Sequence, residues 1–211
     1  MWTPKRLLCI GAHTDDYELG AGGTIARFIE SDMEVIGLSL SFCRGKEPAG
    51  FRAGCLIGEN YQSGEALGID KANIIIENVP VENFDEHRQY ILDRMIDLRD
   101  SFSPDVVLTH CSADIHQDHS VVYAETLRAF KHTTVLGYRM PWNMRHSRED
   151  SFVCLEERHL ETKLAALGCY KSQQHRPYMH PDMIRAQAKL TGLLVNAQLA
   201  ESFETINMVV R

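Results

Sequence analysis

The chain has 211 residues, 44% of them hydrophobic, and a formal net charge of −7. This length and composition can form one sizeable hydrophobic core, so we expect a single domain over residues 1–211. The acidic balance argues against a general nucleic-acid binder, which normally presents a basic face, but it is compatible with a locally positive pocket for an anionic small molecule.

Short apolar runs alternate with amphipathic stretches along the first half of the chain. A run of the kind that is buried in a parallel sheet comes first, and the next stretch is helical, with Ile25, Phe28 and Ile29 on one side. Gly68 suits the C-terminal cap of a second helix. The pattern predicts strands at 7–11, 34–41 and 73–77, a helix at 20–30, a loop at 43–51 and a helix that ends near Leu67.

The second half continues this alternation and then changes character. Pro104 and Asp105 follow a long stretch with helical periodicity and restart the chain into an apolar run. Beyond Arg139 the pattern becomes a polar loop followed by helices. The pattern predicts a helix at 84–102, strands at 106–108 and 133–138, and helices at 120–130, 157–170 and 181–199.

Repeated strand–helix units imply a parallel sheet that is covered by helices and connected by right-handed crossovers. The predicted fold class is α/β: a single-domain Rossmann-like sandwich with a mainly parallel sheet flanked by helices. In such sheets, reactive groups gather in loops beyond the carboxyl ends of the strands, so we expect the active site at the C-terminal ends of the strands.

Nothing in the sequence suggests secretion or a membrane span. The six cysteines are scattered without a Cys-x-x-Cys pair, which disfavours a thiolate zinc cluster. The first residues lead directly into an apolar run and lack the longer apolar region of a signal peptide. No apolar stretch approaches the length that crosses a bilayer. We therefore expect a cytoplasmic protein whose thiols are free or buried.

The first cluster of reactive side chains follows the first predicted strand. His13, Asp15 and Asp16 stand ahead of a glycine-rich turn at 20–23. One alternative is that an aspartate only caps the next helix and that His13 is an ordinary surface or packed histidine. A nucleotide-binding loop is disfavoured, because the glycines do not give Gly-x-Gly-x-x-Gly and two carboxylates would repel a pyrophosphate. Adjacent aspartates point in different directions, so one can coordinate a metal while the other faces a bound water.

The second cluster follows the fourth predicted strand. From His110 to His119 the chain holds three histidines and two aspartates within ten residues. A solvated polar loop is the alternative. A neutral imidazole can ligate a metal, a protonated one can donate to a developing oxyanion, and an aspartate such as Asp118 can orient that second imidazole. The mixture of imidazoles and carboxylates in the two clusters predicts a metal-dependent hydrolase.

Both clusters also resemble a known family. The run from Gly11 to Thr24 resembles the opening motif of the PIG-L/LmbE-like deacetylases, Ala-His-Pro-Asp-Asp followed by Gly-x-Gly-Gly-Thr. The sequence His-Gln-Asp-His at 116–119 resembles their second motif, His-x-Asp/Asn-His. Segments 163–173 and 200–203 resemble the carboxy-terminal half of the family, so the resemblance spans nearly the whole chain.

The resemblance implies a separate chemical role for each of these residues. It implies that three side chains hold a zinc ion, namely His13, Asp16 and His119. Fe²⁺ or another divalent ion can also occupy an N/O site of this type. Asp15 is implied to be the general base that deprotonates the attacking water. His116, supported by Asp118, is implied to stabilise the tetrahedral oxyanion.

The chain departs from the family pattern where a substrate would bind. Thr14 replaces the usual proline, and Leu56 stands where the family often has an arginine that grips the substrate. Arg44 or Arg52 is expected to replace that arginine, and Tyr178 is a further candidate for substrate binding.

The implied activity is removal of the N-acetyl group from a small amino sugar or an N-acetylglucosaminyl conjugate, with acetate and a free amine as products. Two alternatives stay open: cleavage of a larger amide or thiol conjugate, and a non-catalytic protein that binds a metal or ligand. The expected partner is a small N-acetylated sugar, with no nucleic acid and no membrane. Relatives in this family often form trimers or hexamers, so the resemblance also implies a homo-oligomer.

Overall fold

One sheet runs through the molecule. The computed structural model describes residues 3–210. Its seven-stranded sheet has the order β3-β2-β1-β4-β5-β7-β6. The strands from β3 to β5 pair in parallel, whereas β7 pairs antiparallel with both β5 and β6. The strands are β1 (Arg6–His13), β2 (Glu34–Ser41), β3 (Ile74–Ile76), β4 (Val106–His110), β5 (Thr134–Tyr138), β6 (Ser151–Leu155) and β7 (Leu199–Asn207).

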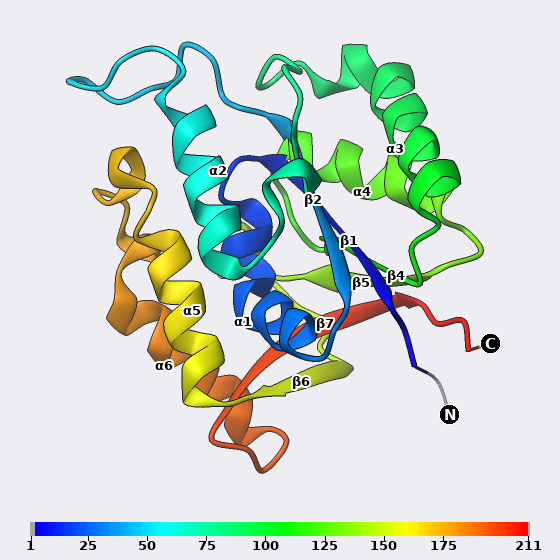
Figure 1. Ribbon diagram of the computed structural model, residues 1–211, viewed down its shortest axis with the longest axis vertical. Coiled ribbons are helices and arrows are strands. Elements are labelled where there is room, and N and C mark those ends of the chain that lie inside the picture. Colours follow the sequence, from blue (N-terminus) through cyan, green and yellow to red (C-terminus); the bar gives the residue numbers. More distant parts are fainter. Residues whose placement is uncertain (1–2, 211) are drawn as a thin grey trace.

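Helices cover both faces of this sheet. α1, α2, α5 and α6 lie on one side, and α3 and α4 lie on the other (Figure 1). Within residues 3–210, none of the helices has the length and apolar character that a membrane crossing requires. The helices are α1 (Asp16–Glu30), α2 (Cys55–Leu67), α3 (Arg88–Phe102), α4 (Gln117–Ala129), α5 (Glu157–Leu167) and α6 (Pro181–Leu193). Short 3-10 helices occupy Lys71–Asn73, Phe84–His87, Pro141–Asn143, Lys171–Gln173 and Pro177–Met179.

Side chains of β1 alternate between two hydrophobic cores. Leu7 and Cys9 belong to the core on the side of α1 and α2, while Leu8 and Ile10 belong to the core on the side of α3 and α4. All four side chains are fully buried. Because a strand covered on both faces is apolar at successive positions, its sequence is a continuous hydrophobic run. The predicted α/β class, with a mainly parallel sheet flanked by helices, is confirmed.

Two antiparallel strands replace parts of the predicted carboxy-terminal half. β6 lies in the segment predicted as a polar loop, and the helix predicted at 181–199 is shorter because β7 follows it. β7 escaped prediction because Glu201 and Glu204 are buried in it. Their partners, Lys163 and Ser112, come from distant segments that no local pattern reveals.

α1 begins earlier than predicted, at the first motif itself. Asp16 is its first residue, and the glycines that we expected to form a turn lie inside the helix. They are required by close packing: a Cβ on Gly20 would lie 2.2 Å from the ring of Tyr138. A Cβ on Gly23 would lie 2.5 Å from the side chain of Leu155. The glycines therefore let α1 approach the sheet closely.

Gly20→Ala is expected to destabilise the protein by about 1–3 kcal/mol, because the new methyl group overlaps the fully buried ring of Tyr138. A lower midpoint of urea denaturation measures this loss. Gly58→Ala in α2 is the matched control, since no atom other than those of its chain neighbours and its own helix backbone lies within 4 Å of the added methyl group. This control should stabilise the protein by about 0.5–1 kcal/mol. Equal midpoints for the two variants would contradict the close packing of α1.

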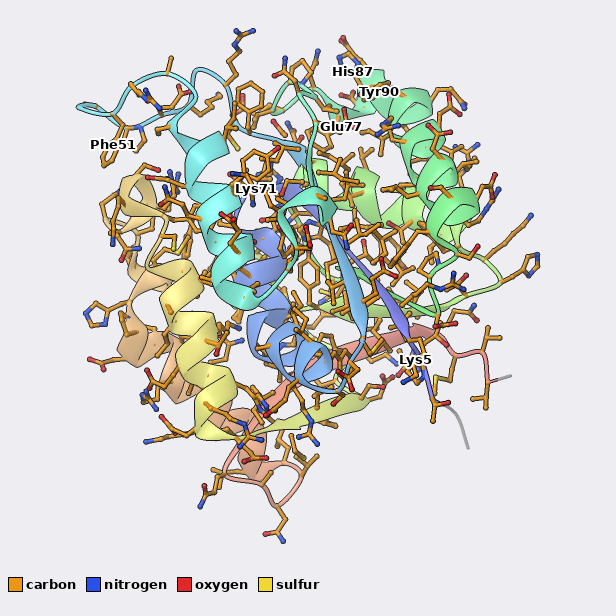
Figure 2. All side chains as sticks on the ribbon, in the orientation of Figure 1. Lys5, Phe51, Lys71, Glu77, His87 and Tyr90 are labelled. Carbon is orange, nitrogen blue, oxygen red and sulfur yellow. The ribbon has the colours of Figure 1, made fainter. Side chains whose placement is uncertain are left out.

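The loop between β2 and α2 extends away from the sheet. Figure 2 shows Phe51 at the outer end of this loop, where its side chain is 41% exposed. Gly45, Gly50 and Gly54 have positive φ and shape the loop. Because the carboxyl ends of parallel neighbours face one edge of the sheet, this loop meets the loops that follow β1 and β4. Both sequence motifs lie at this edge.

Candidate metal centre and active site

The two motifs come together at the carboxyl edge of the sheet. His13 ends β1, and His110 ends the neighbouring strand β4. Asp16 begins α1, and His119 lies in the first turn of α4. Although His13 and His119 are 106 positions apart in the sequence, their rings are in contact.

Three donor atoms form a nearly equilateral triangle. His13 Nδ1 lies 3.3 Å from His119 Nε2 and 3.5 Å from Asp16 Oδ2. The atoms His119 Nε2 and Asp16 Oδ2 are 3.6 Å apart. Ligand atoms held about 2.0–2.1 Å from one tetrahedral zinc ion are roughly 3.3–3.4 Å from one another. The distances within the donor triangle therefore match those around one ion of this type, and His110 and His116 bring further ring nitrogens within 4.8 Å of members of the triangle.

Two carboxylates orient the imidazole rings of this donor triangle. Asp118 Oδ2 is 2.9 Å from His13 Nε2, and Asp114 Oδ2 is 2.8 Å from His119 Nδ1. When these nitrogens donate to the carboxylates, the opposite ring nitrogens present lone pairs to the centre of the triangle. Burial lowers the pKa of His13, but hydrogen bonds with Asp118 and Asp16 outweigh burial and raise it to about 10. The surroundings of His13 therefore favour a positive charge on its ring, whereas burial and the charge of His110 lower the pKa of His119 to about 4.

The carboxylate of Asp118 contacts a different histidine from the one that we expected it to support. It accepts hydrogen bonds from His13 Nε2 and from the backbone N–H of Glu82, not from His116. Only the backbone N–H of Asp118 reaches that ring, where it donates to His116 Nδ1 over 3.2 Å. Asp118 lies in the first turn of α4, and its carboxylate therefore contacts His13 at the end of β1.

Asp118→Asn is expected to weaken zinc binding by about 10–100-fold, because an amide holds the His13 ring less firmly than a carboxylate does. Competition with a chromogenic chelator measures this affinity. Asp85→Asn changes an exposed carboxylate in the same way and serves as the control. If hydrolysis were lost while zinc affinity stayed unchanged, Asp118 would act through His116 after all.

Asp15 adopts a backbone conformation that few residues tolerate. It immediately precedes α1 with a φ of 87°, in the left-handed region where glycine, asparagine and aspartate are the common residues. Burial and the charges of Asp16 and Glu18 raise the pKa of its carboxyl group well above the usual range. Its side chain lines a cavity beside the donor triangle. A carboxylate with a raised pKa is a stronger base, which is the property that proton abstraction needs.

His116 lines the same cavity. Its Nδ1 accepts the hydrogen bond that caps α4, so Nε2 carries the proton of the neutral ring. Burial and the charge of His13 lower the pKa of His116. In this tautomer the neutral ring can donate a hydrogen bond to an oxyanion. Such a hydrogen bond therefore does not require the protonated imidazole that the sequence suggested.

The structure adds His110 to the site, although the sequence assigned it no separate task. Its fully buried Nε2 lies 3.3 Å from Asp16 Oδ2, and its ring stacks on His119 with 3.8 Å between the centres. Burial raises the pKa of Asp16, but the charges of His119 and His110 lower it well below the usual range. Asp16 is therefore held in the anionic form that a metal ligand needs.

A cavity of about 320 Å³ opens beside these residues. Among the expected substrate contacts, Tyr178 lines the cavity, whereas Arg44 and Arg52 are exposed and lie outside its lining. A contact of either arginine with a substrate stays a prediction, since other residues of the same loop, Cys43 and Lys46, do line the cavity. Lys46 and Arg176 supply the positive charges of the lining instead.

Comparison with known proteins agrees with these features. The chain matches the PIG-L family model, described as GlcNAc-PI de-N-acetylase, over residues 8–130, which is more than half of its 211 residues. The chain belongs to the PIG-L family. Membership indicates a deacetylase of this type, that is, a hydrolase of an amide bond. The matched range contains the whole donor triangle and Asp15.

The chain is similar to the three proteins that follow, one in sequence and two in fold. Over 179 residues, 80% of this chain and 91% of the relative, it is 29% identical to the uncharacterized deacetylase YaiS of Escherichia coli K12. Its fold is similar to that of N,N'-diacetylchitobiose deacetylase from Pyrococcus horikoshii (TM-score 0.76, 17% identity, 96% and 84% of the two chains). It is also similar to that of GalB, the 4-carboxy-2-hydroxymuconate hydratase from Pseudomonas putida KT2440 (TM-score 0.78, 20% identity, 98% of both chains). Because a deacetylase and a hydratase share this fold, the fold alone does not determine the reaction.

Proposed function

We propose that this PIG-L protein is a zinc-dependent hydrolase that removes the N-acetyl group from a small amino sugar or an N-acetylglucosaminyl conjugate. The observation that carries the proposal is the donor triangle of His13, Asp16 and His119 beside Asp15. Two imidazoles and one carboxylate are a typical set of protein ligands for catalytic zinc, which takes water in its fourth position. When bound, such an ion lowers the pKa of water and polarises a carbonyl oxygen.

The neighbouring side chains have the chemistry for the remaining steps. Asp15 removes a proton from the attacking water, and this proton passes to the leaving amine as the C–N bond breaks. His116 Nε2–H donates to the oxyanion that develops on the carbonyl oxygen. Attack of water on an acetamide in this arrangement gives acetate and a free amine.

The cavity wall supports a small ring-shaped substrate. Trp142 and Tyr178 both line the cavity and stack on each other, with ring centres 4.1 Å apart and planes 9° apart. Aromatic side chains of this kind offer a large apolar surface together with a polar group. The cavity volume of about 320 Å³ lies near the lower end of the range for small-molecule sites, roughly 300–1,000 Å³, which favours a small substrate over a larger amide.

Metal analysis combined with a screen of amine release tests this proposal. We expect the purified protein to contain zinc and to deacetylate at least one N-acetylated sugar. We also expect chelation to abolish the activity and added zinc to restore it. Bulkier amides in the same screen test cleavage of a larger amide. A protein that holds metal but hydrolyses none of the compounds would contradict the proposal and favour a non-catalytic metal-binding protein.

A further inference from the structure

One wall of the cavity is formed by a short irregular segment, residues 172–178, which we call the wall segment. It lies between α5 and α6, where the chain forms two short 3-10 helices, and its residues Gln173, Arg176 and Tyr178 line the cavity. Its backbone hydrogen bonds include local ones, from Gln173 N–H to Tyr170 O and from Arg176 N–H to Gln173 O. Because local bonds of this kind do not tie a segment to the rest of a fold, its position depends on side-chain contacts with other elements.

The carboxylate of Glu59 in α2 anchors the wall segment. Glu59 Oε1 accepts a hydrogen bond from the backbone N–H of Ser172 over 2.9 Å, and Glu59 Oε2 accepts one from the Ser172 hydroxyl over 2.6 Å. The two residues are buried, with exposed fractions of 9% and 1%. Hydrogen bonds to a carboxylate are stronger than those between neutral groups, and burial strengthens them further. Glu59 therefore joins α2 firmly to a residue 113 positions away.

Hydrogen bonds continue from Ser172 to the cavity. Gln173 Nε2 donates to Ser172 Oγ over 3.0 Å, and Arg176 Nε donates to Gln173 Oε1 over 2.8 Å. Tyr178, whose ring belongs to the aromatic pair of the cavity, follows two residues later. Glu59 itself does not line the cavity. Its influence on a ligand in the cavity therefore passes through the wall segment.

A second anchor holds the chain just before the wall segment. Asn60, the next residue of α2, donates from Nδ2 to the hydroxyl of Tyr170 over 2.8 Å, and this hydroxyl donates to Glu18 Oε1 over 2.8 Å. Tyr170 is fully buried. Loss of the Glu59 carboxylate therefore leaves the chain fixed at Tyr170 and releases the residues after it. The fold can persist while the wall segment changes position.

We propose that Glu59 is a positioning residue for substrate binding, which holds the wall segment in the conformation that receives the substrate. As far as it concerns a substrate, this inference rests on the function proposed above. Without the carboxylate the wall segment occupies further conformations, and the apparent affinity for a ligand falls with the fraction that stays competent. The chemical step should be unaffected, because the carboxylate of Glu59 bonds to Ser172 and not to Asp15 or the donor triangle.

Steady-state kinetics and hydrogen exchange of Glu59→Gln test the inference. The amide offers one acceptor oxygen where the carboxylate offers two, so the Ser172 hydroxyl loses its charged acceptor. For the N-acetylated sugar that the wild-type protein deacetylates fastest, we expect KM to rise about 10-fold, as the loss of one hydrogen bond to a charged group allows. The value of kcat should stay within about twofold, and zinc content should not change. Amide exchange followed by mass spectrometry should accelerate in residues 171–179 and not in β1.

Matched variants identify the contact responsible. Glu65→Gln makes the same change at an exposed position of the same helix and should leave KM and exchange unaltered. Glu59→Asp keeps two oxygens on a shorter side chain and should raise KM less than Glu59→Gln does. If Glu59 acts through Ser172, the double variant Glu59→Gln/Ser172→Ala should raise KM by less than the product of the two single effects.

Equal KM and equal exchange in Glu59→Gln and Glu65→Gln would overturn the inference. A fall in kcat at unchanged KM would also overturn it, because Glu59 would then act on the chemical step. Faster exchange throughout the protein would assign Glu59 to the stability of the whole fold instead. Exchange needs no substrate, so it separates these failures from failure of the proposed function. If the wild-type protein deacetylates none of the sugars, the proposed function fails, while exchange still decides whether Glu59 holds the wall segment.

Discussion

Asp15→Asn is expected to lower the rate of deacetylation by about 10²–10⁴-fold, because it removes the carboxylate that takes the proton of water. Zinc content should stay unchanged, since Asp15 is not part of the donor triangle. Asparagine suits this test better than alanine, because it tolerates the φ of 87° at this position. Rates at saturating substrate and zinc analysis by mass spectrometry measure the two effects.

Asp32→Asn is the matched control for that variant. Asp32 also has a positive φ, 60°, but it is exposed and lies between α1 and β2, outside the cavity lining. The same change of carboxylate to amide should leave both rate and zinc content unaltered there. If Asp15→Asn kept its activity with full zinc occupancy, another group would be the base. If it lost zinc, Asp15 would belong to the ligand set.

Lys163→Met is expected to destabilise the protein by about 3–5 kcal/mol, because it leaves a buried carboxylate without its cation. Lys163 Nζ donates to Glu201 Oε1 and to the carbonyl oxygen of Leu19, both over 2.6 Å. The two side chains of the pair are only 6% and 7% exposed. For a chain of this size the loss corresponds to a decrease in Tm of roughly 6–20 °C, which thermal denaturation measures.

Removal of the partner charge tests the cause of this instability. Glu201 also accepts hydrogen bonds from the backbone N–H groups of Gly23 and Thr24 in α1. In the double variant Lys163→Met/Glu201→Gln, the amide oxygen can keep one of these bonds without a charge, so part of the stability should return. Lys189→Met removes an exposed lysine and should change Tm little. No recovery in the double variant would mean that packing of the lysine stem, not the buried charge, causes the loss.

Much of the sheet could be predicted from the sequence because strands buried on both faces are continuous apolar runs. β1 and β4 are of this kind, and their carboxyl ends locate both motifs. The pattern was insufficient for β7, where Glu201 and Glu204 occupy buried positions. It also misplaced the start of α1, since glycines that usually indicate a turn are needed here for helix packing.

The candidate site, like the sheet, could be predicted from the sequence only in part. The sequence by itself determined the chemical content of the site, because the imidazoles and carboxylates follow strands whose carboxyl ends share one edge. Only the tertiary structure decided which atoms face one another. It paired Asp118 with His13, and it placed Arg176 but not Arg44 in the lining of the cavity. Hydrogen bonds depend on distances and angles between segments far apart in the chain, and no local pattern of residues encodes those quantities.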